Sequence, residues 1–213
     1  MTAVRGSKAK RCVVVGKTNV GKTLFAINFA EHLGAKTVLL RRAGSGRPDG
    51  AGYRISYSPE DARGEMVSAE PHRTLTPQVL VVEMRAGKVR READVVDTPG
   101  LGDHIDERLE VRQGMAAALR AVYEADLVLH VVDASRVGDP AAEEAPGEVD
   151  QQLARFARFK AGYAILANKM DLPGADAGLR AIRQLFPGEY VIPMSALRST
   201  GFDEVRAFVR RHL

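Results

Sequence analysis

The stretch GKTNVGKT, Gly16 to Thr23, constrains the fold of this chain more than any other feature of the sequence. The β-branched run Val13–Val15 comes directly before it, and a helix-type run beginning at Leu24 follows it. The stretch fits the pattern G-x-x-x-x-G-K-[ST], which requires a strand before it and a helix after it. We therefore expect a strand–loop–helix unit whose loop is built around a phosphate, the alternative being a glycine turn that matches by chance.

Each residue type in this loop suits phosphate binding. Gly16 and Gly21 allow the backbone to wrap closely with amide N–H groups pointing inward, and the helix N-terminus adds partial positive charge. Lys22 would reach the β- and γ-phosphates, and the Thr23 hydroxyl would ligate Mg²⁺. The residues expected to line the phosphates are Gly16, Lys17, Thr18, Asn19, Val20, Gly21, Lys22, Thr23 and Leu24.

The rest of the chain alternates strand-like and helix-like segments, which is typical of an α/β fold with helices on both faces of the sheet. Six runs are apolar on both faces, as strands of a covered parallel sheet are: Arg11–Val15, Val79–Met84, Ala93–Val96, Leu127–Val132, Tyr163–Ala167 and Tyr190–Ile192. Helical spacing predicts helices over Lys22–Leu33, Arg108–Tyr123, Asp150–Phe159, Asp176–Phe186 and Phe202–His212.

The predicted fold is a three-layer P-loop fold with a mostly parallel six-stranded sheet. The second and third predicted strands flank Ala86-Gly87. They are therefore expected to form a hairpin, which makes Val79–Met84 an antiparallel edge strand.

The length of 213 residues suits one domain with an inserted loop. We expect a basic flexible tail over residues 1–10 and one α/β domain over 11–213. Residues 43–77 contain GSGRPDGAG and SPEDARGE and are long for a connection, so they are expected to be functional or disordered. Thr37–Arg41 is expected to form a short strand leading into them.

Composition excludes several classes of protein. No apolar run reaches the roughly 18 residues of a membrane span, and the N-terminus lacks the apolar part of a secretory signal. A single cysteine, Cys12, excludes a disulfide framework. We therefore expect a cytoplasmic protein. The net charge of +4 allows an anionic partner such as RNA but does not require one.

Three further polar motifs follow predicted strands, where open α/β sheets bind ligands. Asp97-Thr98-Pro99-Gly100 follows one strand, Asn168-Lys169-Met170-Asp171 a second, and Ser195-Ala196 a third. Asp97 offers a carboxylate for the Mg²⁺ side, and Gly100 can expose its backbone N–H to a γ-phosphate. Each motif alone is a good turn or cap, but the four in this order favour one nucleotide site.

With GKTNVGKT, DTPGL, NKMD and SAL in this order, the sequence resembles the Era/TrmE/Der-type bacterial P-loop GTPases of the translation-factor-related class over nearly the whole chain. The resemblance implies GTP and GDP as ligands, Mg²⁺ as cofactor and slow GTP hydrolysis. It also implies roles around the guanine base. Asp171 would bind N1 and N2, Asn168 would support the loops, Lys169 would lie along the base, and Ser195 and Ala196, with Leu197 beside them, would reach O6.

The family requires a switch I threonine that closes on Mg²⁺ and the γ-phosphate. Thr74 and Thr76 both stand at plausible positions in HRTLTPQ, with a slight preference for Thr74. The expected metal ligands are therefore Thr23, Asp97 and one of these two threonines.

Leu101 stands where a Ras-type enzyme would have its water-positioning glutamine, and leucine cannot polarise water. Some members of the resembled family recruit K⁺ instead, and Asn19 stands where those members carry a K⁺-binding asparagine. One hypothesis is that K⁺ supplies the missing charge; the other is that Asn19 only shapes the loop. The expected catalytic set is Lys22, Thr74, Thr76, Gly100 and Asn19.

Three cellular roles stay open at this point. They are a ribosome or RNA assembly factor, a switch that recruits a protein in signalling, polarity or development, and a GTP-binding module with little hydrolysis. The effector and the oligomeric state are unreadable from the sequence, and a GTP-dependent dimer stays open.

Overall fold

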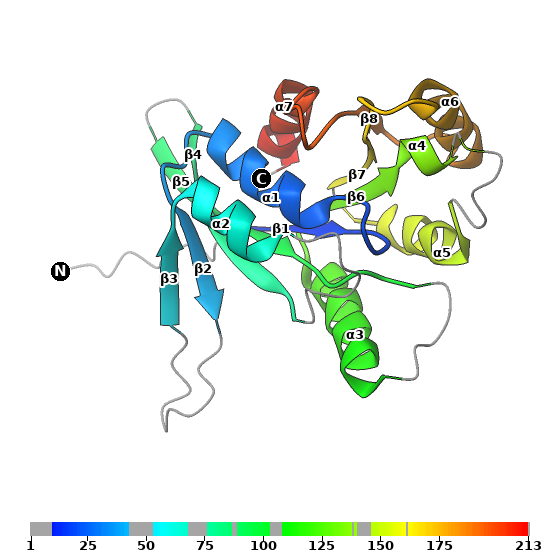
Figure 1. The fold of residues 1–213 in the computed structure, drawn as a ribbon. Helices are drawn as coiled ribbons and strands as arrows, with labels where there is room; N and C mark the ends of the chain where they lie inside the picture. The colour runs from blue at the N-terminus through cyan, green and yellow to red at the C-terminus, as the bar shows by residue number, and fades with distance from the viewer. Residues whose placement is uncertain are drawn as a thin grey trace.

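The computed structural model describes residues 10–42, 53–67, 76–86, 89–102, 108–137, 139, 146–160 and 162–212. Strands and helices alternate along them (Figure 1). In chain order these are β1 Lys10–Val15, α1 Lys22–His32, β2 Val38–Arg42, β3 Tyr53–Tyr57, α2 Pro59–Met66, β4 Gln78–Ala86, β5 Val89–Asp97, α3 Leu109–Glu124, β6 Leu127–Asp133, α4 Ala134–Val137, α5 Glu148–Ala157, β7 Gly162–Asn168, α6 Ala175–Leu185, β8 Val191–Pro193 and α7 Phe202–His212.

One mixed sheet runs through the molecule in the strand order β3-β2-β4-β5-β1-β6-β7-β8. Strand β1 lies between β5 and β6 and is parallel to both, and β6, β7 and β8 continue the parallel part. Strand β4 is antiparallel to β5, β2 is antiparallel to β4, and β3 is antiparallel to β2. The carboxyl ends of β1, β5, β6, β7 and β8 therefore meet at one edge of the sheet.

Helices cover both faces of this sheet, as predicted (Figure 1). The alternation of side chains along β1 shows the two layers: Cys12 and Val14 pack in one core, and Val13 and Val15 in the other. Helices α1, α2 and α7 contribute to the first core, and α3, α5 and α6 to the second. The three-layer α/β prediction is confirmed.

The predicted strand number and sheet edge were wrong. The sheet has eight strands rather than six, because β2 and β3 extend it beyond the hairpin. Val79–Met84 therefore lies inside the sheet as part of β4, and β3 forms the edge. Strand β3 and helix α2 both arise within residues 43–77, where the sequence led us to expect a loop.

Helix α2 has a local physical basis that the polar composition of this segment conceals. Ser58 caps it by accepting a hydrogen bond of 3.1 Å from the Asp61 backbone N–H, and Pro59 occupies the first helical turn. Ala62 and Met66 are buried in the core beside α1. Two apolar residues one turn apart are enough to seat a helix of eight residues.

All five predicted helices are present, and α4 is an additional short helix. None of the helices in the described ranges combines the length and the apolar character that crossing a membrane requires. The predicted N-terminal tail lies outside the described residues, except for Lys10, which begins β1.

Candidate nucleotide-binding site

The loop between β1 and α1 can only be built with glycine at two positions. Gly16 has φ 149° and Gly21 has φ 96°. A Cβ at Gly16 would lie 2.2 Å from the Val131 carbonyl oxygen, and one at Gly21 would lie 2.5 Å from Nδ2 of Asn168. Between them, exposed Asn19 takes the left-handed conformation at φ 60°, which asparagine tolerates better than most residues.

Lys22 begins α1 and is turned back over this loop. Its side chain is buried, and Nζ donates a hydrogen bond of 2.6 Å to the Lys17 carbonyl. Burial lowers the pKa of Lys22 to about 8, although the charges of Asp97 and Asp150 oppose this shift. An ammonium group has three donors, so a phosphate in the loop would gain both further hydrogen bonds and a buried positive charge.

Thr23 and Asp97 meet across the end of the sheet. The Thr23 hydroxyl donates a hydrogen bond of 2.7 Å to Oδ2 of Asp97, whose side chain is fully buried. Among the described residues, Oδ1 of Asp97 has no hydrogen-bond partner. Burial raises the pKa of Asp97 to about 6, and the Thr23 hydrogen bond and the Lys22 charge oppose the shift.

The hydroxyl oxygen of Thr23 and Oδ1 of Asp97 fit Mg²⁺. This cation prefers oxygen ligands, and it is commonly bound by one or two protein oxygens with phosphate and water completing the shell. An unpaired carboxylate oxygen in a buried position is costly unless a cation or donor arrives. Of the other expected ligands, Thr74 lies outside the described residues. Thr76 is exposed just before β4.

Gly100 and Leu101 lie directly against the phosphate loop. The Leu101 backbone N–H donates a hydrogen bond of 3.1 Å to the Gly16 carbonyl. A Cβ at Gly100 would lie 2.5 Å from Oγ1 of Thr18, so this position has no room for a side chain. The Leu101 side chain is 2% exposed and packs in the core between α3 and the sheet. It therefore cannot position a water molecule.

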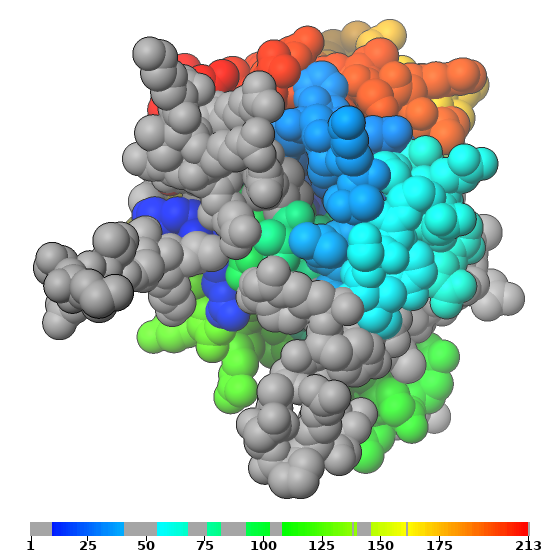
Figure 2. Space-filling model, turned by 90° about the vertical axis from the view of Figure 1, so that its left-hand side faces the viewer, coloured from blue at the N-terminus to red at the C-terminus, as the bar shows by residue number. Residues whose placement is uncertain are grey.

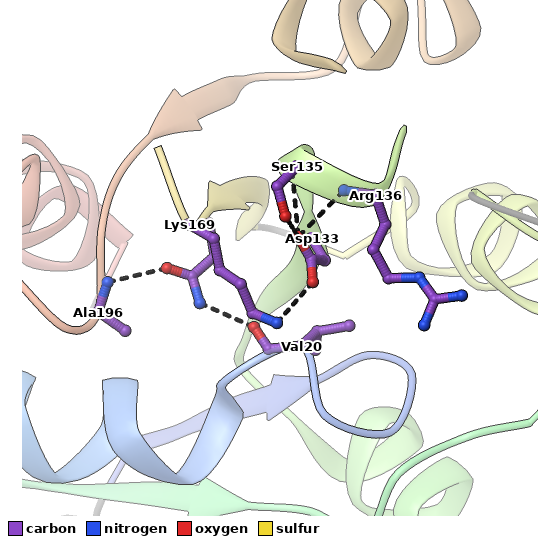
Figure 3. A network of polar contacts seen from close by, with 7 residues as sticks. Val20, Asp133, Ser135, Arg136, Lys169 and Ala196 are labelled. Atoms are coloured by element: carbon purple, nitrogen blue, oxygen red, sulfur yellow. Dashed lines mark hydrogen bonds and ion pairs between the residues drawn. The ribbon is translucent and has the colours of Figure 1, made fainter. Parts of the chain in front are cut away.

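Asn168 holds the phosphate loop and the Ser195–Ala196 loop together. At the end of β7, its Nδ2 donates a hydrogen bond of 2.7 Å to the Val20 carbonyl, and its Oδ1 accepts one of 2.8 Å from the Ala196 N–H. The side chain is 1% exposed. Figure 3 shows Val20 and Ala196 on opposite sides of this bridge.

Lys169 makes a contact that the sequence reading missed. Its Nζ lies 2.6 Å from Oδ2 of Asp133, and the other carboxylate oxygen of Asp133 accepts hydrogen bonds from Ser135 and Arg136 (Figure 3). Asp133 ends β6, so the strand-end rule that selected Asp97 would have found it. The ion pair fixes the direction of the Lys169 side chain.

Asp171 and Ser195 are also brought together. The Ser195 hydroxyl donates a hydrogen bond of 2.6 Å to Oδ1 of Asp171, and it accepts one of 3.0 Å from the Arg198 N–H. Ser195 is 1% exposed, whereas Asp171 is exposed. The Asp171 carboxylate is thus held on one side by the Ser195 hydroxyl and exposed to solvent on the other. Leu197 is 63% exposed and lies outside this contact.

The strand-end motifs of one sheet edge therefore form one continuous constellation. A buried lysine and a hydroxyl–carboxylate pair lie at one end of it, and an amide-bridged pair of loops with an exposed carboxylate lies at the other. The fold and this site define a P-loop GTPase of the translation-factor-related class. The chain belongs to the 50S ribosome-binding GTPase family, whose model matches residues 60–169, about half of the sequence.

Individual relatives agree with this membership. The chain is 34% identical over 111 residues to the tRNA modification GTPase MnmE of Aquifex aeolicus, covering 52% of this chain and 21% of that protein. It is 26% identical over 215 residues to the GTPase Obg of Alkaliphilus oremlandii, covering 99% of this chain and 44% of that protein. The chain thus spans less than half the length of either relative.

A solved structure of Era in complex with MgGDPNP and a segment of 16S ribosomal RNA superposes with a TM-score of 0.65. The match covers 97% of this chain and 57% of that chain at 21% identity. At this identity the likeness shows the fold alone.

Proposed function

We propose that this chain binds GTP and GDP with Mg²⁺, hydrolyses GTP slowly, and acts as a nucleotide-dependent switch. The observation that carries the proposal is the Thr23–Asp97 pair beside buried Lys22. A hydroxyl, a carboxylate with one oxygen that no described residue pairs, and a lysine with further donors together match what a Mg²⁺–triphosphate requires.

The end of the site that contains Asp171 and Ser195 favours binding of guanine over adenine. Asp171 is open on one side, and its carboxylate can only accept hydrogen bonds. Guanine offers two donors, at N1 and N2, in a row that a carboxylate can take up, and adenine does not. Ser195 holds the carboxylate in place at 2.6 Å, so the preference would be built into a pre-positioned group.

The chain's own residues would then work as follows in hydrolysis. Lys22 holds the β- and γ-phosphate oxygens, and the Gly100 N–H would donate to the γ-phosphate. Thr23 and Asp97 would hold Mg²⁺, which when bound neutralises charge on these phosphates. Water attacks the γ-phosphorus in line, the bond to the GDP oxygen breaks, and the proton leaves with inorganic phosphate. Leu101 only packs, so intrinsic turnover is slow.

Lys22→Ala tests the proposal. Fluorescent GDP and GTP binding would be measured by titration with Mg²⁺, with exposed Lys36→Ala as the matched control. Removing a charged donor should weaken binding roughly ten- to a hundredfold, while the circular dichroism spectrum and the melting temperature stay those of a folded chain. Unchanged affinity in a folded Lys22→Ala variant would overturn the phosphate-loop assignment.

We further propose a ribosomal or RNA effector in the cytoplasm for the GTP-bound form. The family's name, 50S ribosome-binding GTPase, and the 16S ribosomal RNA bound by the structurally similar Era support this choice over a protein-recruiting switch. Capture from lysate on immobilised chain tests it, with GDP and a non-hydrolysable GTP analogue compared. Ribosomal subunits enriched with the analogue would support the proposal, and a single non-ribosomal protein enriched instead would overturn it.

A further inference from the structure

A buried asparagine on α1 links the inserted helix α2 to the loop proposed to bind guanine. Asn28 is 8% exposed and lies among the apolar residues of the core on that face. Its Nδ2 donates a hydrogen bond of 2.8 Å to the Ala196 carbonyl, and its Oδ1 accepts one of 2.9 Å from Nη1 of Arg63. Both ends of the amide are therefore used.

The direction of this amide is fixed by chemistry. A backbone carbonyl can only accept and a guanidinium group can only donate, so the NH₂ end must face Ala196 and the oxygen must face Arg63. A buried amide satisfied at both ends resists rotation, because turning it would leave two polar groups unpaired. Arg63 and the Ala196 carbonyl together thus set the direction in which the Asn28 amide points.

The backbone of Ala196 is held by side-chain amides through both its carbonyl and its N–H, which belong to two successive peptide groups. Its carbonyl accepts from Asn28, and its N–H donates to Asn168, which in turn donates to the Val20 carbonyl. A chain of hydrogen bonds, joined through the Ala196 backbone, thus runs from α2 through α1 to the Ser195–Ala196 loop. From there Asn168 continues it to the loop between β1 and α1.

Arg63 is well placed to couple α2 to this chain. Its guanidinium also contacts Glu31 of α1 at 2.7 Å, and its side chain is 34% exposed. Buried Ala62 and Met66 also pack on this face of the core, so α2 has apolar contacts there that do not involve the arginine. Figure 2 shows α2 in cyan against α1 in blue, with the C-terminal part of the chain in orange and red beside them.

We propose that Arg63 is a positioning residue for the guanine-binding loop. Through Asn28 it fixes the Ala196 carbonyl, so the docking of α2 on α1 and the retention of guanine nucleotide favour each other. Coupling of this kind is reciprocal: whatever pulls α2 away speeds nucleotide release, and bound nucleotide tightens α2. Because α2 belongs to the segment before the predicted switch I threonines, an effector that binds there would reach the base loop by this route. The inference rests on the proposed function.

The test is the dissociation rate of fluorescent GDP, chased with excess unlabelled GDP. Arg63→Met keeps the aliphatic stem and removes the donors, and it should release GDP about tenfold faster. Arg63→Lys should lie between it and the wild type. Glu31→Gln is the matched control, because it changes the partner of Arg63 that lies outside the chain of hydrogen bonds, and its rate should equal that of the wild type.

A double-mutant cycle separates positioning from general loosening. Once Asn28→Ala has broken the chain, adding Arg63→Met should bring no further acceleration. Hydrogen exchange of the Ala196 amide should rise in Arg63→Met and stay unchanged in Glu31→Gln. In the wild type, GDP should slow exchange across α2.

Two results would overturn the inference alone, with the wild type binding GDP. One is a folded Arg63→Met variant that releases GDP at the same rate as the wild type. The other is the same acceleration by Arg63→Met with and without Asn28. Failure of the wild type to bind any guanine nucleotide would instead overturn the proposed function, and this inference with it.

Discussion

The Thr23 hydroxyl and the Asp97 carboxylate lie 2.7 Å apart, joined by a hydrogen bond, and the second, buried carboxylate oxygen has no partner in the part of the chain that the structure describes. Burial of this carboxylate raises its pKa to about 6. The charged form of Asp97 is therefore destabilised in the metal-free chain, and a bound cation would stabilise it. We therefore expect both Mg²⁺ binding and stability to depend on pH in the range around 6.

Mg²⁺-dependent nucleotide binding should weaken as the pH falls through about 6. Protonation removes the charge that would attract the metal, so one pH unit below this value the apparent Mg²⁺ affinity should fall about tenfold. Mg²⁺ titrations of fluorescent GDP binding at several pH values would measure this. An apparent affinity independent of pH between 5 and 7 would show that Asp97 is not on the metal side of the site.

The same carboxylate predicts the opposite pH trend for stability without metal. A folded-state pKa above the ordinary value of 3.8 means that the folded chain binds more protons, so this group favours folding at low pH and loses that contribution as the pH rises through about 6. Asp97→Asn removes the buried charge. In metal-free buffer at pH 8 it should raise the melting temperature, while Mg²⁺ should no longer stabilise it; a melting temperature below that of the wild type would contradict this.

Nucleotide selectivity should depend on Asp171 and on the residue that holds it. Asp171→Asn replaces an acceptor by a donor and should weaken GDP binding roughly a hundredfold while improving binding of xanthosine diphosphate. Ser195→Ala keeps the acceptor but removes its 2.6 Å hydrogen bond, so guanine affinity should fall less and xanthine affinity should not rise. Competition assays would measure both, and equal competition by ATP and GTP in the wild type would contradict the assignment.

Gly100 is predicted to separate binding from hydrolysis. A methyl group there would meet Oγ1 of Thr18 at 2.5 Å and its Cα at 2.8 Å, so Gly100→Ala should push the segment after Asp97 away from the phosphate loop. Loss of one backbone donor to the γ-phosphate should lower hydrolysis about a hundredfold, with GDP affinity retained. Gly64→Ala is the control, because a Cβ at Gly64 would have no atom within 4 Å. Gly188→Ala would not serve, because Gly188 has φ 83°, where alanine is strained.

The elements that the sequence predicted best are those whose local and tertiary preferences agree. GKTNVGKT places glycine at the two positions with φ 149° and 96°, and the apolar runs on either side have strand and helix preferences that agree with this loop. Strand-end polar residues were found because parallel strands share a carboxyl edge. The roles given to the individual site residues stay predictions.

The elements that were missed depend on contacts between distant parts of the chain. Strand β3 exists because β2 offers it an edge, and α2 because Ala62 and Met66 find a site beside α1. Arg63 and Asn28 are 35 residues apart, and no spacing rule pairs them. Asn28, a polar residue within the apolar run of α1, was the one visible signal in the sequence. Its role could be recognised only from its contact with Arg63 in the structure.

The last prediction concerns how the chain compensates for Leu101, which packs in the core instead of orienting water. Asn19 is exposed, takes φ 60° and borders a cavity of about 210 Å³ beside the phosphate loop. If a K⁺ ion bound by Asn19 supplies positive charge to the phosphates, hydrolysis should be faster in KCl than in NaCl at equal ionic strength. Asn19→Ala should remove that difference while GDP affinity stays. Equal rates in the two salts would leave Asn19 with a conformational role only, and Asn19→Gly, which tolerates the same φ, should then behave like the wild type.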